Sequence, residues 1–531
     1  MPAQRMGPTR TLIGVDVGST HIKAALVEPG SGVVHVARRA TQTHAVRGGG
    51  AYHRPGEILA GVESTIAECV AKAGPRHRPA AIGIASMAEA GVPVDRRYVP
   101  VGDIMAWHDT RPERQAAWLE RQIGAAPLFA RTGLRPEPKY TLPKLLWLRE
   151  HKAAEFTRLR HWAGVAELVA LELTGRLATN ASLACRTLAF DVSARAWDSE
   201  LLALASLGPD EMPEVLPLGV AAGGLTEAAA ARLGLPSGLP VAIAGHDHLA
   251  SALGAGVTKP GEVLDSMGSA EATLLITERP ALADEIRRGG FSTGCHAMDG
   301  LTYVSGGLQS SGALVDWFLA TFLSRARGGT GGSGAAGHGR ASAMAGGAEE
   351  AERYARFVEL LEMAGPGPVE PLVRPYLRGR TAPHRDPSAS LEFEGLRETH
   401  SLADLAAAVV DGAAYHVRWM LDELARITGT SLDHVKLTGG GARNRRWVVA
   451  KAALGPGRLE VVRTDEAAAL GASLVAGVAG GVYGSVEEAL ADAAPYDRVT
   501  AAATVRARYD AVYLDHWLPA VLTRLRQNGS Y

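Results

Sequence analysis

The sequence predicts an α/β protein of two domains, and three observations lead to this prediction. The chain has 531 residues, which is more than one compact hydrophobic core usually holds. Hydrophobic residues make up 47% of the chain and aromatic residues only 5%, a composition that favours packed sheets and helices over an all-β sandwich. Short apolar runs ending in small polar residues alternate with long Ala/Leu/Glu/Arg segments, as expected for strands and helices.

The composition also excludes several classes of protein. The formal net charge is −1 and the pI is 7.0, so no overall charge favours nucleic acid or an anionic membrane as a partner. The first ten residues lack the apolar core of a signal peptide. The cysteines Cys69, Cys185 and Cys295 lie far apart without metal-binding spacing, which indicates reduced thiols. We therefore expect a soluble, cytoplasmic protein.

The first informative segment, residues 11–27, predicts a strand, a tight Gly-Ser-Thr turn and a second strand. A P-loop or dinucleotide-binding glycine motif would open a helix instead, and neither motif occurs here. Further strands are predicted at 80–85 and 240–244. Long helices are predicted at 114–122 and 402–427.

A second copy of the strand-turn-strand pattern indicates two related halves. Residues 262–276 again run from apolar residues through a Gly-Ser turn to apolar residues, and Gly18 and Gly268 lie about 250 residues apart. A chance match of two short patterns is the alternative. Two such turns facing each other would offer backbone N–H groups to a polyphosphate from both sides.

Residues 325–350 interrupt this organisation. They consist mainly of glycine, alanine and serine and have no apolar period, which predicts a mobile surface insertion. We favour a plain flexible loop over a functional lid.

The segment around the first turn supplies groups that phosphoryl transfer needs. The turn amides and the hydroxyls of Ser19 and Thr20 can bond phosphate oxygens, and Lys23 adds charge. Asp16, at the predicted strand end, can hold Mg²⁺, usually through water because Mg²⁺ dehydrates reluctantly. An ordinary hairpin without a ligand is the alternative interpretation.

A Gly-His-Asp-His motif at 245–248 follows a predicted strand and precedes a helix. Asp247 at the carboxyl end of a strand lies where α/β sheets bind ligands, and such a carboxylate can accept a hydroxyl proton during transfer. A simple helix N-cap is the alternative for Asp247. The histidines His246 and His248 also suggest a metal site, but this spacing alone is a weak signal.

A third glycine turn, residues 438–444, follows the predicted strand 435–437 and opens a helix. Because glycine has no side chain, such a turn lets a flat base or a sugar approach the backbone closely. Glycine turns are common, so this motif alone has moderate specificity.

Together these segments resemble the FGGY family of carbohydrate kinases, within the actin-like and hexokinase-like ATPase superfamily. The resemblance runs in order through residues 11–518. It is carried by the segments 14–20, 107–111, 132–134, 144–147, 245–248, 268–269, 375–380, 386–387, 438–445 and 466–472.

The resemblance implies an ATP-dependent kinase that uses Mg²⁺ and phosphorylates a small sugar, ketose or polyol. Asp247 would be the catalytic base, and Asp16 with Asp247 would form the metal site. The ATP and phosphate contacts implied by the family fall on Ser19, Thr20, Gly268, Ser269, Gly440, Gly441 and Asn444, and Lys23 adds charge beside them.

The implied acceptor contacts depart from familiar members of the family. Glu89 aligns with a hydroxyl-binding glutamate of glycerol-type members, but its neighbours are alanines. Trp107 matches the family's substrate-wall tryptophan, and Asp109, His248 and Asp247 complete the expected acceptor site. Lys139 occupies the place of a tyrosine in glycerol-type members. Neither a glycerol kinase nor a xylulokinase label fits fully.

The implied fold is a pair of actin-like, ribonuclease H-like α/β domains with a central cleft. We expect an acceptor-binding and catalytic domain at 8–256, a nucleotide-binding domain at 257–500 and a helical tail at 501–531. Family members often self-associate, so a homodimer is compatible with the resemblance. Two other functions stay open: an actin-like ATPase without an acceptor, and a non-catalytic sugar sensor, although the latter predicts loss of Asp16 or Asp247, and both are present.

Overall fold

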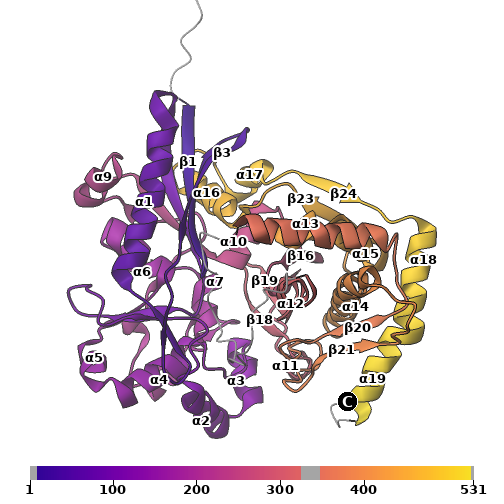
Figure 1. Ribbon diagram of the computed structural model, residues 1–531. Coiled ribbons are helices and arrows are strands. Elements are labelled where there is room, and N and C mark those ends of the chain that lie inside the picture. The colour runs from indigo at the N-terminus through magenta and orange to yellow at the C-terminus, as the bar shows by residue number, and fades with distance from the viewer. Residues whose placement is uncertain (1–8, 324–346, 528–531) are drawn as a thin grey trace, which may run out of the picture. The chain divides into compact units, whose positions relative to one another are not determined.

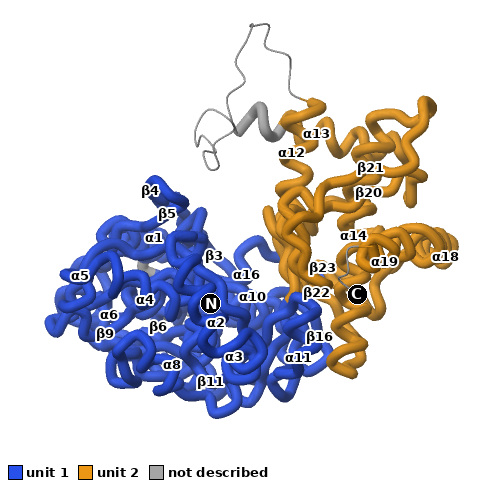
Figure 2. The backbone as a smooth tube through the Cα atoms, turned by 90° about the horizontal axis from the view of Figure 1, so that it is seen from below, with its two compact units in different colours: residues 1–264, 274–305, 462–496 blue, residues 265–273, 306–461, 497–531 orange. Residues whose placement is uncertain are grey.

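The structure, a computed structural model, describes residues 9–323 and 347–527 (Figure 1). The chain divides into two compact units (Figure 2). The first comprises residues 1–264, 274–305 and 462–496, and the second comprises residues 265–273, 306–461 and 497–531. The first crossing between the units follows residue 264, and the segments 274–305 and 462–496 return to the first unit.

The first unit is built on a six-stranded sheet in the order β14-β15-β6-β1-β2-β3. The central strands β15, β6 and β1 are parallel, whereas β14, β2 and β3 pair antiparallel at the two sides. The three parallel strands therefore end at the same edge. The strand bounds are β1 Thr9–Val17, β2 His21–Glu28, β3 Gly32–Ala40, β6 His77–Ser86, β14 Ala221–Gly224 and β15 Pro240–His246.

Helices cover both faces of this sheet. Side chains alternate across a strand, so Ile13, Val15 and Val17 of β1 join one core cluster while Leu12 joins the other. The first cluster includes α1 (Pro55–Ala73), α6 (Val165–Thr174) and α9 (Glu227–Leu233). The second includes α10 (Asp247–Gly254) and α16 (Ala467–Ala479). Burial on both faces explains why these strands are almost continuously apolar.

Helix α16 belongs to this unit because glycines let it lie directly on the sheet. A methyl group at Gly14 of β1 would collide with the carbonyl of Ala469, and one at Gly83 of β6 would collide with the carbonyl of Ala472. Any larger residue at either position would force the helix away from the strands. This packing brings residues from the far end of the chain onto the N-terminal sheet.

A smaller five-stranded sheet, in the order β4-β5-β8-β7-β9, extends the first unit. Its bounds are β4 His44–Val46, β5 Gly50–His53, β7 Gly91–Val94, β8 Ile104–Met105 and β9 His161–Gly164. The remaining helices of the unit are α2 Glu113–Ile123, α3 Ala125–Thr132, α4 Thr141–His151, α5 Ala153–Arg158, α7 Ala181–Ala184, α8 Ser199–Leu204, α11 Asp284–Arg288 and α17 Val486–Ala489. Short strands complete it: β10 Ala178–Thr179, β11 Phe190–Asp191, β12 Ala196–Trp197 and β13 Glu214–Val215.

A second large sheet has seven strands in the order β18-β19-β17-β16-β22-β23-β24. Their bounds are β16 Glu262–Met267, β17 Glu271–Thr277, β18 Ser292–Cys295, β19 Thr302–Leu308, β22 His434–Thr438, β23 Arg458–Val462 and β24 Tyr496–Val499. Outside this sheet, the second unit contains β20 Leu372–Pro375, β21 Leu391–Glu394, α12 Gly312–Phe322, α13 Gly347–Met363, α14 Leu402–Thr428, α15 Arg445–Leu454, α18 Ala503–Val512 and α19 Leu518–Gln527, with a π-helical turn at Tyr513–Trp517.

The long helix α14 shows how local sequence sets element ends in the second unit. Ser401 caps its start, because its hydroxyl accepts the Asp404 N–H while the Asp404 carboxylate accepts the Ser401 N–H. Gly429 ends it in the left-handed conformation. The predictions of this helix, of the helix at 114–122 and of the strands at 80–85 and 240–244 are confirmed.

Two other expectations concern segments of the chain rather than single elements. Most of the predicted insertion at 325–350 lies outside the described residues, and its last four residues begin α13. Within residues 9–323 and 347–527, every helix is too short or too polar to span a lipid bilayer.

Two fully buried histidines make the fold sensitive to acid. Burial and nearby Arg195 lower the pKa of His296 to about 3, and burial and Arg380 lower the pKa of His416 to about 3. The ordinary value of 6.5 applies in the unfolded chain. Between these values the unfolded chain binds more protons, so stability is full above pH 6.5 and is lost as the pH falls toward 3.

We therefore expect His296→Asn to reduce the pH dependence of unfolding. Each buried histidine should remove about 1.4 kcal/mol of stability when the pH is one unit below 6.5. Urea unfolding at pH 7.5 and pH 5.5 measures this difference for the wild type and the variant. The matched control is His151→Asn, because His151 is an exposed histidine at the last position of α4. A variant that loses as much stability as the wild type on acidification would contradict the prediction.

Candidate active site

Two carboxylates lie at the carboxyl ends of the parallel strands β1 and β15, on either side of β6. Asp16 pairs in register with Ala85 of β6, and His246, which precedes Asp247, pairs with Ser86. Strand register therefore places both carboxylates at the same level of the sheet. In open α/β sheets this edge is where ligands bind.

Asp16 carries a buried carboxylate oxygen, Oδ1, for which the described residues offer no hydrogen-bond partner. Burial and the charge of Asp247 raise the pKa of Asp16 to about 7. Lys23 lies opposite it in β2, but its ammonium pairs with Glu466 at 2.7 Å. A buried, unsatisfied carboxylate oxygen beside a second carboxylate suits a bound cation.

The turn after β1 has the predicted strand-turn-strand form. The Gly18 N–H donates to the His21 carbonyl at 3.0 Å, and the Thr41 hydroxyl donates to the Gly18 carbonyl at 2.7 Å. Ser19 is partly exposed and Thr20 is exposed. The turn is thus fixed through its backbone while both hydroxyls remain accessible.

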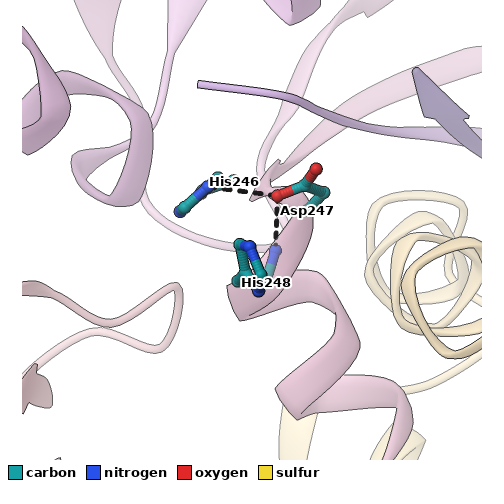
Figure 3. A group of neighbouring side chains, drawn as sticks. All are labelled: His246, Asp247 and His248. Carbon is teal, nitrogen blue, oxygen red and sulfur yellow. Dashed lines mark hydrogen bonds and ion pairs between the residues drawn. The ribbon is translucent and has the colours of Figure 1, made fainter. Parts of the chain in front are cut away.

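Asp247 is the first residue of α10 and is held by its two neighbours (Figure 3). His246 Nε2 lies 3.1 Å from Asp247 Oδ1, and the His248 backbone N–H donates to the same oxygen at 2.7 Å. Burial alone would raise its pKa, but His246 and His248 outweigh burial and lower the pKa to about 2. Asp247 is therefore an ionised carboxylate, and neither of these contacts uses Oδ2.

The alternative of Asp247 as an N-cap does not match this geometry. His246 occupies the N-cap position and makes no side-chain cap bond. The ligand atoms of His246, Asp247 and His248 do lie within 4.8 Å of one another, the one such group of three found among the described residues. The hydrogen bonds within the group account for its arrangement without a metal ion.

Glu89 follows β6 at the same edge of the sheet. Its backbone is left-handed, with φ of 64°, a conformation that is strained for a residue with a side chain. Its Oε1 accepts from Arg186 Nε at 2.9 Å and from Nη2 at 2.6 Å. Burial would raise the pKa of Glu89, but the charges of Arg186, His246 and Lys139 lower it, so this carboxylate is ionised too.

Neither Arg186 nor Glu466 is among the site residues expected from the sequence. Arg186 is the one charged residue in the stretch 178–190, and this isolation is the signal that could have identified it. Its guanidinium also lies over the Tyr140 ring, 5.5 Å from the centroid. Glu466 precedes α16 and pairs with both Lys23 and Arg38. Its position depends on packing between distant segments.

The other expected acceptor residues have different surroundings. Trp107 is 41% exposed, so its ring is accessible. Asp109 is only 1% exposed, and both of its oxygens accept from Arg111, an arrangement that favours a structural role. Lys139 pairs with Glu137 at 2.7 Å.

In the second unit, Gly268 and Ser269 form the turn between β16 and β17. The Gly312 and Ala313 N–H groups at the start of α12 donate to the carbonyls of these two turn residues, each at 3.0 Å. Buried Lys451 bonds to both Asp265 and Glu271, one in each strand of the hairpin. The hairpin predicted by the internal repeat is present and is anchored on both sides.

The third glycine turn connects β22 to α15. Gly440 and Gly441 lie in a short 3₁₀ turn, and Asn444 caps α15 by accepting the Trp447 N–H at 3.1 Å. Gly439 has φ of 87° and packs against the Met267 backbone, so only glycine fits there. The turn is open at Gly440, where an added Cβ would meet no atom within 4 Å.

Known proteins resemble the chain over most of its length. Xylulose kinase of Klebsiella pneumoniae is 28% identical over 472 residues, covering 88% of this chain and 89% of that protein. Gluconokinase of Bacillus subtilis is 23% identical over 473 residues, covering 88% and 87%. The solved structure of xylulose kinase from Rhodospirillum rubrum matches with a TM-score of 0.84 at 25% identity, covering 98% and 99%.

Two family models match in succession. The N-terminal domain of the FGGY family of carbohydrate kinases matches residues 11–254, and the C-terminal domain of the same family matches residues 264–480. These matches confirm the resemblance, the two-domain actin-like fold and the identification as a carbohydrate kinase. The chain belongs to the FGGY family of carbohydrate kinases.

Proposed function

We propose that this carbohydrate kinase transfers the γ-phosphoryl group of ATP to a hydroxyl of a neutral ketose or polyol, with Asp247 as the base. The observation that carries the proposal is the state of Asp247. It is an ionised carboxylate at a strand end, oriented through Oδ1 by His246 and the His248 amide. Oδ2 of Asp247 takes no part in those bonds, but they fix the orientation of the carboxylate and so the position of Oδ2.

Asp247 would accept a hydrogen bond from the acceptor hydroxyl and take its proton as the bond to phosphorus forms. Holding that hydroxyl in line for attack contributes much of the acceleration in such reactions. A carboxylate of low pKa is a weak base, so its main contribution is orientation, with proton transfer late in the step.

Mg²⁺ fits the residues present, because Asp16 has a buried oxygen to which no described residue donates a hydrogen bond, and it lies beside Asp247. Asp16 would hold the ion, with Asp247 nearby. When bound, the ion would neutralise charge on the phosphates. Ser19 and Thr20 would bond phosphate oxygens on the first unit. In the second unit we assign Gly268 and Ser269 to the phosphates, and Gly440, Gly441 and Asn444 to the adenosine.

The acceptor class follows from the charges around Glu89. The ionised Glu89 carboxylate can accept hydrogen bonds from hydroxyl groups, and the neighbouring cations Arg186 and Lys139 are already paired with Glu89 and Glu137. Paired cations favour a neutral, hydroxyl-rich acceptor over a sugar acid. The second candidate, a sugar acid, is supported by the similarity to gluconokinase.

The experiment measures ADP release from ATP and Mg²⁺ with ketoses, aldoses, polyols and gluconate. Turnover with a neutral ketose or polyol would support the proposal, and turnover with gluconate alone would favour the second candidate. ADP release that needs no acceptor would instead support the ATPase alternative. Tight sugar binding without turnover would support the sensor.

We expect Asp247→Asn to lower kcat by about 10²–10⁴-fold while ATP still binds, because the amide cannot take the proton. Steady-state kinetics and calorimetric ATP binding measure the two effects. Asp103→Asn, at an exposed aspartate of the same unit, is the matched control and should behave as the wild type. Retention of more than a tenth of the wild-type kcat would remove Asp247 from this role.

Glu89→Gln should raise the KM for the acceptor by about 10-fold and change the KM for ATP less than twofold. The amide keeps the shape of the side chain, but it is a weaker acceptor of hydrogen bonds from hydroxyl groups and leaves Arg186 without the Glu89 counter-charge. Glu214→Gln, at an exposed glutamate, is the control. Equal increases in both KM values would indicate a folding defect and contradict the assignment.

Asp16→Asn should raise the Mg²⁺ concentration needed for half-maximal activity by at least about 10-fold, because an amide is a weaker ligand for a hard cation than a carboxylate. Titration of activity with Mg²⁺ at saturating ATP measures the change, and Mg²⁺ binding in the absence of acceptor provides a second readout. An unchanged Mg²⁺ requirement would show that Asp16 does not hold the ion.

A further inference from the structure

Lys144, on the first turn of α4, is fully buried and is among the largest side chains with no exposed surface. Its ammonium donates to the backbone carbonyl of Glu89 at 2.6 Å and to that of Ala106 at 2.8 Å. The Met105 carbonyl lies 3.5 Å away. Three carbonyl oxygens therefore surround a group that has three donors and no acceptor.

A buried lysine is an unusual choice for a core position. Removing an ammonium from water is unfavourable unless its donors are satisfied, and burial lowers the pKa of Lys144 to about 7, against the opposing charges of Glu89 and Asp109. A leucine or methionine would fill the same space without this penalty. Unlike these apolar side chains, the lysine ammonium donates hydrogen bonds to two separate backbone segments, at Glu89 and at Ala106.

Those two segments carry the residues assigned to the acceptor. One is the segment after β6 that holds Glu89, whose backbone is left-handed. The other is the segment after β8, in which Ala106 immediately precedes Trp107. The bond from Lys144 falls on the carbonyl of the strained residue itself, where it opposes relaxation of the backbone to an ordinary conformation.

A second buried cation, Arg186, binds the side chain of Glu89. Arg186 binds the Glu89 carboxylate through Oε1, whereas Lys144 binds the Glu89 backbone carbonyl. Side chain and main chain are thus fixed independently, by cations from α4 and from the segment after α7. Neither contact involves Oε2 of Glu89.

We propose that Lys144 is a positioning residue for the acceptor, which fixes the backbone of Glu89 and the segment leading to Trp107 and so sets acceptor affinity. The inference rests on the proposed acceptor contacts of Glu89 and Trp107. Lys144 itself touches no reacting atom. Its removal should affect acceptor binding much more than nucleotide binding or the transfer step, whereas a merely structural lysine would affect all three together.

The test compares Lys144→Met, which removes the donors and keeps an unbranched apolar chain, with Lys144→Arg, which keeps a cation and donors. Lys152→Met removes an exposed lysine just beyond the same helix and is the matched control. For each protein, steady-state kinetics give kcat and both KM values on the acceptor identified by the panel. Calorimetry gives the dissociation constants of the acceptor and of ATP, and thermal unfolding checks the fold.

We expect Lys144→Met to raise the acceptor KM and dissociation constant by at least about 10-fold, with less than a twofold change for ATP and a smaller change in kcat. Lys144→Arg should recover part of the acceptor affinity, and Lys152→Met should match the wild type. An acceptor KM within twofold of the wild type in folded Lys144→Met would overturn the proposal. Parallel losses of acceptor and ATP affinity would overturn it too.

If Lys144→Met does not fold, Lys144→Arg decides the question. A planar guanidinium cannot place its donors at the point where the ammonium meets the carbonyls, so the proposal predicts a raised acceptor KM with a normal ATP KM. An unchanged acceptor KM in that variant refutes the role. Absence of acceptor-dependent turnover in the wild type would refute the proposed function itself, which is a separate outcome.

Discussion

The parallel pairing of β1, β6 and β15 is the constraint on which the rest of the site depends. Because the three strands run in the same direction and in fixed register, the residues that follow them reach one edge of the sheet. Asp16 is the penultimate residue of β1, Glu89 follows β6 and Asp247 follows β15. Residues separated by more than 200 positions in sequence thereby meet without any long loop to place them, and rigid strands hold catalytic groups more precisely than loops do.

Carboxylates that lie close together repel one another, and the surrounding residues stabilise their charges to different extents. His246 and the His248 amide stabilise the charge of Asp247, and Arg186 stabilises the charge of Glu89. Oδ1 of Asp16 has no hydrogen-bond partner among the described residues, and burial and the charge of Asp247 raise the pKa of Asp16 despite the opposing charge of Lys23. Surroundings that shift the pKa values of neighbouring acids in opposite directions are typical of catalytic sites. Here the acid with the raised pKa is Asp16, the residue suited to a metal ion.

Features encoded in consecutive residues could be predicted from the sequence, and features produced by distant packing could not. The hairpin after Asp16 and the strand-to-helix junction at Asp247 are local patterns, and both are present. The partnership of Arg186 with Glu89 joins residues 97 positions apart, so no spacing reveals it. Asp109 and Arg111 are two residues apart, so their ion pair is local, but the sequence does not report that the Asp109 side chain is almost completely buried.

We propose that the carboxylates at this sheet edge direct phosphoryl transfer to an acceptor hydroxyl. The most direct measurement is ³¹P NMR of the products formed from ATP, Mg²⁺ and the best acceptor of the panel. Phosphoryl transfer to an acceptor should give a new phosphomonoester resonance that grows in step with ADP and couples to the protons of a sugar or polyol carbon. Inorganic phosphate as the only product, formed at the same rate without acceptor, would contradict it.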